Sequence, residues 1–406
     1  MPFTYMGTKK QIVSDVVEVV RGAKSGPFLD LFSGISSVGV GVAPARQVWC
    51  NDAQNFAYTL ATAKFTSKSS PAIDASLLSD ILDRTQFNGS RLLMKLGRSV
   101  LEEDICLHEG EISAVCRLVK KQILSADSNV ASDIRSTHRL DRKKTPYCLF
   151  SISYVGGYLG ARQAFDIDSL RYAIDSLRWD GEISVDQHRW FVLALCKALF
   201  AVSNTTGHFA QYLDVKPSTL ARFLAKRRRN VLTEWLHAVR DLAPAGTEAW
   251  RRENRTFRGD ATKLLLKLKK QDMRPAVIYA DPPYTGDQYS RYYHLLETLL
   301  DYDYPDLSGK GQYRPDRFVS DFSKKTKVAA AFDTLVSGVA DLNAELIINY
   351  PKNGLLADTK ASLLATMRKY YSHAEVAAEI AHEHSSLGAS KGIERSAVTE
   401  LIFYAR

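Results

Sequence analysis

Short apolar runs that end at polar or small residues stand near both ends of the chain. Each run is a few residues long, and segments with helical spacing of apolar residues follow several of them. Runs of this kind are typical of buried strands in a parallel sheet. The pattern predicts a doubly wound α/β sheet, in which ligands bind at the carboxyl ends of the strands. The five predicted strands cover residues 27–32, 47–50, 276–280, 344–349 and 398–404.

The stretch between residues 66 and 254 has a different pattern. Helical spacing dominates there, for example in residues 75–82, 111–124 and 190–202, with polar segments in between. We therefore expect a mostly helical domain inserted into the α/β domain. The predicted division is an α/β domain over residues 1–65 and 255–406, interrupted by an insertion over residues 66–254.

Composition and charge limit the class of protein. The 406 residues suit two or three domains, and 45% hydrophobic with 24% charged residues is ordinary for a globular protein. The net charge of +9 favours a polyanionic partner. Five scattered cysteines without CxxC spacing disfavour a zinc or disulfide framework and favour a reducing compartment. Residues 1–10 lack an apolar signal region, and the longest apolar stretch is too short to span a bilayer. We expect a cytoplasmic protein with no membrane partner.

The most informative segment is Asp281-Pro282-Pro283-Tyr284, directly after a predicted strand. The carboxylate of Asp281 can accept a hydrogen bond from an exocyclic amino group. The prolines fix the backbone, so that the carbonyl of Pro282 can accept the second proton of that amine. The ring of Tyr284 offers a face for stacking. This segment predicts a pocket for a flat base that carries an amino group, although a simple turn that caps a strand is the alternative interpretation.

A second chemical signal lies in residues 30–34, at the end of the first predicted strand. Ser33 and Gly34 allow a close backbone approach, and Asp30 can bind an ammonium or a hydroxyl group. The segment differs from the dinucleotide pattern GxGxxG, and its aspartate would repel a pyrophosphate. A nucleoside that bears an amino acid fits better, with Asp52 one βα unit later at the ribose hydroxyls. The alternative is a tight turn whose acid caps a helix.

Four segments in this order resemble the DNA adenine methylase family of S-adenosylmethionine-dependent methyltransferases. The resemblance covers both ends of the chain well and the middle thinly. It implies a Rossmann-like methyltransferase sheet with a helical target-recognition domain, and double-stranded DNA as the partner. The implied reaction is methyl transfer to the exocyclic N6 of an adenine flipped out of DNA. The segments are YMGTK at residues 5–9, DLFSG at 30–34, ND at 51–52 and DPPY at 281–284.

The resemblance also implies roles for individual cofactor-binding residues. Asp30, Phe32 and Gly34 would face the methionine moiety of S-adenosylmethionine, and Asp52 its ribose. Ser33 is a further implied cofactor contact. One position departs from the family pattern, because Ser36 stands where the turn usually carries a second glycine. Further cofactor contacts are implied for Tyr5, Gly7 and Lys9, which also line the base pocket, and for Asp260 and Asp281.

The implied catalytic residues are Asp281, Pro282 and Tyr284. Two acceptors on the amino group would localise its lone pair and stabilise the positive charge that develops on nitrogen. No metal is expected, since a sulfonium releases a neutral thioether. His294 follows two tyrosines, and we expect a hydrogen-bonded structural role for it.

Residues 216–240 read as one amphipathic helix that a run of four cations interrupts. A solvated charged face is the simpler interpretation of such a run. In a basic protein that must grip phosphates, however, contact with DNA is favoured. The predicted DNA-binding residues are Lys226, Arg227, Arg228 and Arg229, together with Tyr292.

Several functions remain open from the sequence. The same pocket suits methyl transfer to the N4 amino group of cytosine or to RNA, and an inactive DNA-binding homologue is the alternative from another class. The main hypothesis is a site-specific adenine methyltransferase of a restriction-modification or phage-defence system, located at the nucleoid. A cognate restriction endonuclease or another defence protein is a further candidate partner.

Overall fold

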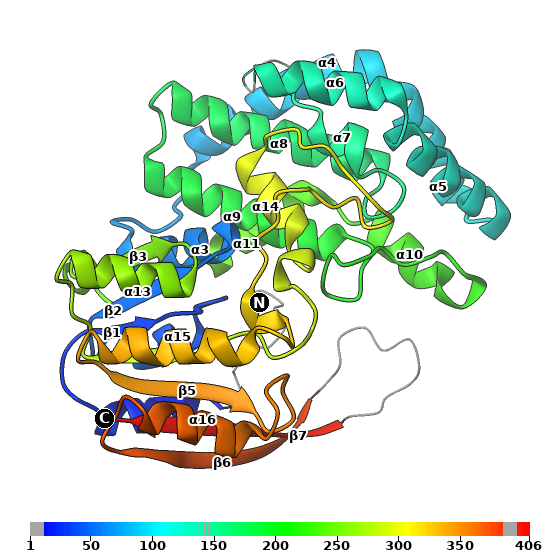
Figure 1. The fold of residues 1–406 in the computed structure, drawn as a ribbon. Helices are drawn as coiled ribbons and strands as arrows, with labels where there is room; N and C mark the ends of the chain where they lie inside the picture. Colours follow the sequence, from blue (N-terminus) through cyan, green and yellow to red (C-terminus); the bar gives the residue numbers. More distant parts are fainter. Residues whose placement is uncertain (1–11, 142, 144–145, 385–395) are drawn as a thin grey trace. The chain divides into compact units, whose positions relative to one another are not determined.

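The structure is a computed structural model that describes residues 12–141, 143, 146–384 and 396–406. The chain divides into two compact units, each built from segments that are distant in the sequence (Figure 1). The described residues of the sheet unit are 12–68, 244–292, 318–384 and 396–406. The described residues of the helical unit are 69–243, without 142, 144 and 145, and 293–317. No helix in these described ranges is long and apolar enough to cross a membrane.

The sheet unit contains a seven-stranded sheet in the order β3-β2-β1-β4-β5-β7-β6. Strands β1 to β5 are parallel, whereas β7 pairs antiparallel with both β5 and β6. The strands are β1 (Phe28–Asp30), β2 (Val48–Asp52), β3 (Arg255–Arg258), β4 (Val277–Ala280), β5 (Glu345–Pro351), β6 (Ala374–His384) and β7 (Ser396–Ala405).

The strand order reverses between β1 and β4. Strands β2 and β3 lie on one side of β1, and strands β4 to β7 lie on its other side. A reversal of this kind leaves a crevice beyond the carboxyl ends of the two central strands. Asp30 ends β1 and Asp281 follows β4, so the topology brings the two predicted functional segments to the same crevice. The predicted Rossmann-like α/β fold is confirmed.

Both faces of the central strands are buried, which explains why these strands are apolar runs rather than alternating patterns. Successive residues point to opposite faces, so Phe28 and Leu29 belong to different hydrophobic clusters. Helices α1 (Val13–Gly22), α2 (Ser37–Val42) and α3 (Asn55–Thr66) cover the face of Phe28. Helices α13 (Ala261–Lys270), α15 (Val328–Ala340) and α16 (Thr359–Arg368) cover the face of Leu29. The short helix α12 (Glu248–Arg252) precedes β3.

The helical unit is organised around two buried helices, α8 (Ala161–Trp179) and α9 (Val185–Val202). The longest apolar stretch of the chain lies in α9 and is a buried helix, as expected. The other helices are α4 (Ala75–Glu109), α5 (Ile112–Ala126), α6 (Asn129–Leu140), α7 (Leu149–Ser153), α10 (Leu220–Arg227), α11 (Val231–Asp241) and α14 (His294–Asp301).

The prediction of one helix over residues 216–240 is wrong. A 3-10 turn at Pro217–Thr219 leads into α10, which ends at Arg227, and α11 begins at Val231. Asn230 separates the two helices, because its side chain accepts a hydrogen bond from the N–H of Thr233 at 2.8 Å and caps α11. The basic run therefore lies at the carboxyl end of α10 and in the following turn, where cations complement the helix dipole.

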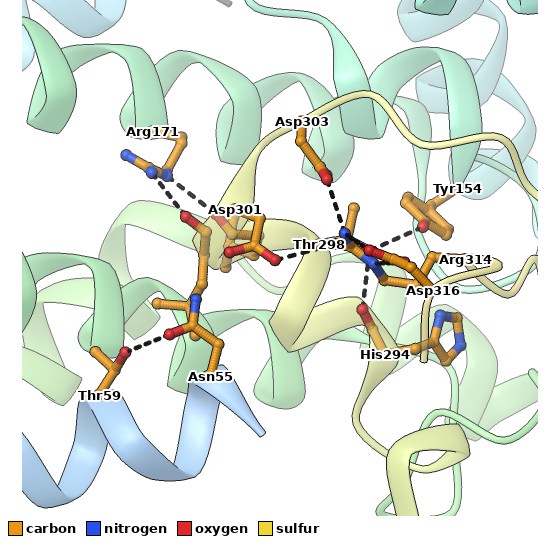
Figure 2. A network of polar contacts seen from close by, with 12 residues as sticks. Asn55, Thr59, Tyr154, Arg171, His294, Thr298, Asp301, Asp303, Arg314 and Asp316 are labelled. Atoms are coloured by element: carbon orange, nitrogen blue, oxygen red, sulfur yellow. Dashed lines mark hydrogen bonds and ion pairs between the residues drawn. The ribbon is translucent and has the colours of Figure 1, made fainter. Parts of the chain in front are cut away.

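The predicted domain division places residues 293–317 in the α/β domain, whereas in the structure they pack within the helical unit. Buried Arg171 connects this segment to α8, and buried Arg314 cross-links the segment internally (Figure 2). Arg171 of α8 donates to the carbonyls of Leu299 at 3.1 Å and Leu300 at 3.2 Å. Arg314 forms ion pairs with three carboxylates of the segment, those of Asp301, Asp303 and Asp316. The predicted outer boundaries are residues 66 and 254, whereas the first part of the helical unit runs from Ser69 to Ala243.

Candidate active site

A pocket lies at the carboxyl ends of the central strands, entirely within the sheet unit. Segments that follow four parallel strands line it, and two segments around residues 288–290 and 318–322 complete its wall. Of the predicted site residues in the described part of the chain, this pocket brings together Asp30, Phe32, Ser33, Gly34, Asp52, Asp260, Asp281, Pro282 and Tyr284.

Asp30 is the most buried acid of the pocket, with 2% of its surface exposed. Burial raises its pKa to about 8, and the carboxylates of Asp281 and Asp52 add to the effect. Its Oδ1 atom has no hydrogen-bond partner among the residues that the structure describes. A buried acceptor without a partner, beside two further carboxylates, fits a cationic group such as an ammonium.

Asp52 supports the turn after β1. Its Oδ2 accepts a hydrogen bond from the N–H of Gly34 at 2.9 Å, and its Oδ1 accepts one from the N–H of Gln54 at 2.9 Å. Burial raises the pKa of Asp52 to about 6, and these N–H groups oppose the shift. The acid thus connects the ends of β1 and β2. Gln54 also lines the pocket, although its position in the sequence carries no motif that marks it as a site residue.

The backbone conformation at Ser36 explains why glycine is the usual residue at this position. Its φ is 62°, in the left-handed region that costs a residue with a Cβ atom about 1–2 kcal/mol. The side chain is fully buried, and its hydroxyl lacks a hydrogen-bond partner within the described ranges. The turn therefore adopts the conformation that glycine would allow, and the backbone at Ser36 is strained.

Replacing Ser36 by glycine should therefore stabilise the protein by about 1 kcal/mol, since the strain and the buried hydroxyl both disappear. The free energy of unfolding, measured by urea denaturation, checks this. Ser37→Gly is the matched control, because Ser37 begins α2 and its replacement should destabilise by up to about 1 kcal/mol. A loss of stability in Ser36→Gly would contradict the proposed strain.

The segment after β4 is fixed from two sides. Asn349 of β5 donates from Nδ2 to Oδ1 of Asp281 at 3.5 Å and to Oε2 of Glu400 at 2.8 Å. The carbonyl of Tyr284 accepts a hydrogen bond from the N–H of Leu355 at 3.2 Å. The ring of Tyr284 packs edge-on against the ring of Tyr350. Asn349 is fully buried. Its place at the end of a predicted strand was the signal that could have identified it.

Two other predicted cofactor residues have structural contacts as well. Phe32 packs edge-on against Phe322, with ring centroids 5.4 Å apart. Asp260 caps α13, since its Oδ1 accepts from the N–H of Lys263 at 3.1 Å and from the hydroxyl of Thr262 at 2.6 Å. These contacts hold both residues in place at the pocket wall.

The remaining predicted residues lie elsewhere. Tyr5, Gly7 and Lys9 are outside the described residues. Tyr292 belongs to the sheet unit and is 8% exposed, and its contact with DNA stays a prediction. His294 is buried in the helical unit, where Nε2 lies 3.0 Å from the carbonyl oxygen of Phe209 and burial lowers its pKa to about 3. A structural role was expected for His294.

The four cations of the basic run differ in exposure. Arg227 is 5% exposed, donates to the carbonyl of Gly156 and stacks on Phe223, so its guanidinium does not reach phosphates in this conformation. Arg228 and Arg229 are exposed, and Lys226 is half-buried. Each of these three also donates to a backbone carbonyl of the helical unit. The geometry keeps Lys226, Arg228 and Arg229 as candidate phosphate contacts and gives Arg227 a packing role.

The fold and the pocket define a Rossmann-like methyltransferase unit, and comparison with known proteins specifies the class. The family model described as "D12 class N6 adenine-specific DNA methyltransferase" matches residues 148–361, more than half of the chain. The chain belongs to this family, which confirms the resemblance.

Three curated relatives are similar over most of the chain. Modification methylase LlaI of Lactococcus lactis subsp. lactis is 22% identical over 98% of this chain and 54% of its own length. Type II methyltransferase M.FokI of Planomicrobium okeanokoites is 26% identical over 87% of this chain and 45% of its own. Modification methylase StsI of Streptococcus sanguinis is 23% identical over 87% and 44%. The chain thus spans about half the length of the curated relatives that it matches.

Proposed function

We propose that this chain is a site-specific DNA methyltransferase that transfers a methyl group from S-adenosylmethionine to N6 of adenine. Family membership and the names of the relatives support this function. The main structural support for this function is the pocket between β1 and β4, which Asp30, Asp52 and the segment that begins at Asp281 line together. A cofactor with a cationic amino-acid end and a base with an amino group are the two ligands that this arrangement suits.

The residues present fit S-adenosylmethionine, which supplies a methyl group on a sulfonium centre. Asp30 offers the buried Oδ1 that lacks a partner in the described structure to the ammonium group. Asp52 accepts from two backbone N–H groups and keeps further lone pairs for ribose hydroxyls. Asp260, which caps α13 and lines the pocket, is proposed to contact the adenine moiety of the cofactor.

Asp281 and Pro282 are proposed to act on the target base. An aromatic amine is a weak nucleophile because its lone pair is delocalised into the ring. Two acceptors on the amino group localise the lone pair and stabilise the positive charge that develops during transfer. A base inside a duplex cannot enter such a pocket, so it must be flipped out and stacked, here on Tyr284.

The helical unit is proposed to recognise the target DNA. Its exposed cations Arg228 and Arg229 are suited to phosphate contacts, which position a protein on DNA without reading its sequence. The biological role that the relatives' names suggest is modification of DNA, with a cognate restriction endonuclease as a candidate partner.

Replacing Arg228 and Arg229 together by glutamine should weaken binding to cognate and unrelated DNA by similar factors. The slope of log affinity against log salt should become shallower by about one unit per lost contact. Fluorescence anisotropy at several salt concentrations measures both quantities. The matched variant Arg227→Gln should instead lower the free energy of unfolding, because Arg227 is buried against Phe223. Unchanged affinity and salt slope in the double variant would show that the run is only a solvated face.

Sequencing that detects modified bases, applied to DNA from cells that express this chain, tests the proposed function. Modified adenines at one recurrent site are expected. Modified cytosines, or labelled methyl groups in RNA rather than DNA in a parallel transfer assay, would favour the alternative substrates. A chain that binds DNA but transfers no label would be the inactive homologue.

A further inference from the structure

Two short segments of the sheet unit are joined to each other beside the pocket. They are residues 287–290 and 318–323, which we call the clasp. The side-chain amide of Gln288 pairs with the backbone of Ser320 in both directions. Its Nε2 donates to the carbonyl of Ser320 at 3.1 Å, and its Oε1 accepts from the N–H of Ser320 at 2.7 Å. The hydroxyl of Ser290 donates to the carbonyl of Phe318 at 2.7 Å.

The clasp also forms one wall of the pocket. Gln288, Ser290 and Ser320 line it together with the aromatic rings of Tyr289, Phe318 and Phe322. Phe322 packs edge-on against Phe32 of the cofactor turn at 5.4 Å and against Phe332 of α15 at 5.2 Å. Ser290 and Ser320 are 6% and 8% exposed, so their hydrogen bonds are largely shielded from water. The wall is therefore held by polar contacts on one side and by the core on the other.

Along the chain, the two halves of the clasp flank a segment that belongs to the other unit. Residues 293–317 lie in the helical unit, and the chain enters and leaves that segment directly after and before the two halves of the clasp. Within the helical unit, buried Arg171 of α8 donates to two backbone carbonyls of the segment, and the ion pairs of Arg314 cross-link the segment internally (Figure 2). Only Arg291 and Tyr292 separate the first half of the clasp from this segment, and Arg317 is followed directly by the second half, so the covalent links between them are short.

We propose that Gln288 and Ser290 are positioning residues that couple target recognition to methyl transfer. They hold the aromatic wall against which the target base is aligned, and they transmit DNA binding by the helical unit to that wall. The cofactor turn has its own contacts outside the clasp, because Asp52 accepts from the N–H groups of Gly34 and Gln54. This inference rests on the proposed function.

The test uses the full chain with Gln288→Met, which keeps the shape of the side chain and removes both hydrogen bonds, and Ser290→Ala. Gln271→Met is the matched control, since Gln271 is exposed at the end of α13. Single-turnover transfer should fall about 10–100-fold in the first two variants, in line with the cost of misplaced reactants. Affinity for S-adenosylmethionine should stay within about twofold of wild type. Ser290→Thr, which keeps the hydroxyl, should restore most of the rate.

A second measurement does not depend on activity. Hydrogen exchange in peptides that cover residues 287–290 and 318–323 should slow when DNA is added to the wild type and to Gln271→Met. It should not change in Gln288→Met. Wild-type rates of transfer in Gln288→Met, or an equal response to DNA in all variants, would overturn the inference. If the wild type transfers no methyl group, the proposed function fails, and the exchange response alone decides whether the clasp transmits DNA binding.

Discussion

Asp281→Ala should abolish methyl transfer while binding of S-adenosylmethionine and DNA stays close to wild type. The carboxylate acts chiefly on the amino group of the base, where charge develops during transfer, whereas Asp30 and Asp52 provide the main proposed contacts to the cofactor. The loss of one charge-stabilising group in an active site costs about 10²–10³-fold in rate, and here the nucleophile also loses its activation. Single-turnover transfer and calorimetric titration measure the two effects separately.

Two further variants sharpen this prediction. Asp281→Asn keeps an acceptor oxygen without the charge, so its rate should lie between those of the wild type and Asp281→Ala. Asp333→Ala removes a partly exposed acid on α15 that does not line the pocket and should leave the rate unchanged. A rate within about tenfold of wild type in Asp281→Ala would exclude the proposed role, because the expected loss is larger.

Asp30→Asn should weaken binding of S-adenosylmethionine by about 2–3 kcal/mol, the usual effect of removing a charged partner from a hydrogen bond. The same replacement should stabilise the protein without cofactor. The pKa of Asp30 is raised to about 8 from an ordinary value of 3.8, so the folded state favours the neutral acid. The contribution of Asp30 to stability therefore falls as the pH rises from about 4 to about 8, and the neutral amide removes this loss. Thermal unfolding at several pH values checks the effect.

Proton release provides a direct control for the role of Asp30. Below about pH 8 the acid is mostly protonated without ligand, and binding of a cationic ammonium favours its ionised form. Cofactor affinity should then rise by up to about tenfold per pH unit between about pH 6 and about pH 8. Calorimetry in buffers of different ionisation enthalpy should detect the released proton in the wild type and not in Asp30→Asn. Equal heats in all buffers for the wild type would contradict the account.

The sequence predicted the central strands because both faces of the sheet are buried, which makes those strands continuous apolar runs. It missed β3 and β6, which lie at the two edges. The sequence of β3, Arg255–Arg258, is polar and partly exposed, and β6 is rich in alanine and glutamate with one face open. Neither has the composition of a buried strand.

The predicted site residues were those in compact segments after strands, where chemistry and topology coincide. The clasp was missed because Gln288 and Ser320 come from loops without periodic spacing and meet only after the chain has passed through the helical unit. The basic run shows that neighbouring residues with the same charge in the sequence can have different environments in the structure. Four consecutive cations give one signal in the sequence, but helix geometry turns Arg227 inward and leaves Arg228 and Arg229 exposed.

The most direct test of the central claim is the identity of the methylated nucleoside. Purified protein is incubated with double-stranded DNA and S-adenosylmethionine that carries a labelled methyl group, and the DNA is digested to nucleosides for mass spectrometry. The account predicts labelled N6-methyladenine with the wild type and its absence with Asp281→Ala. Label in N4-methylcytosine, or equal amounts of labelled product from the two proteins, would contradict it.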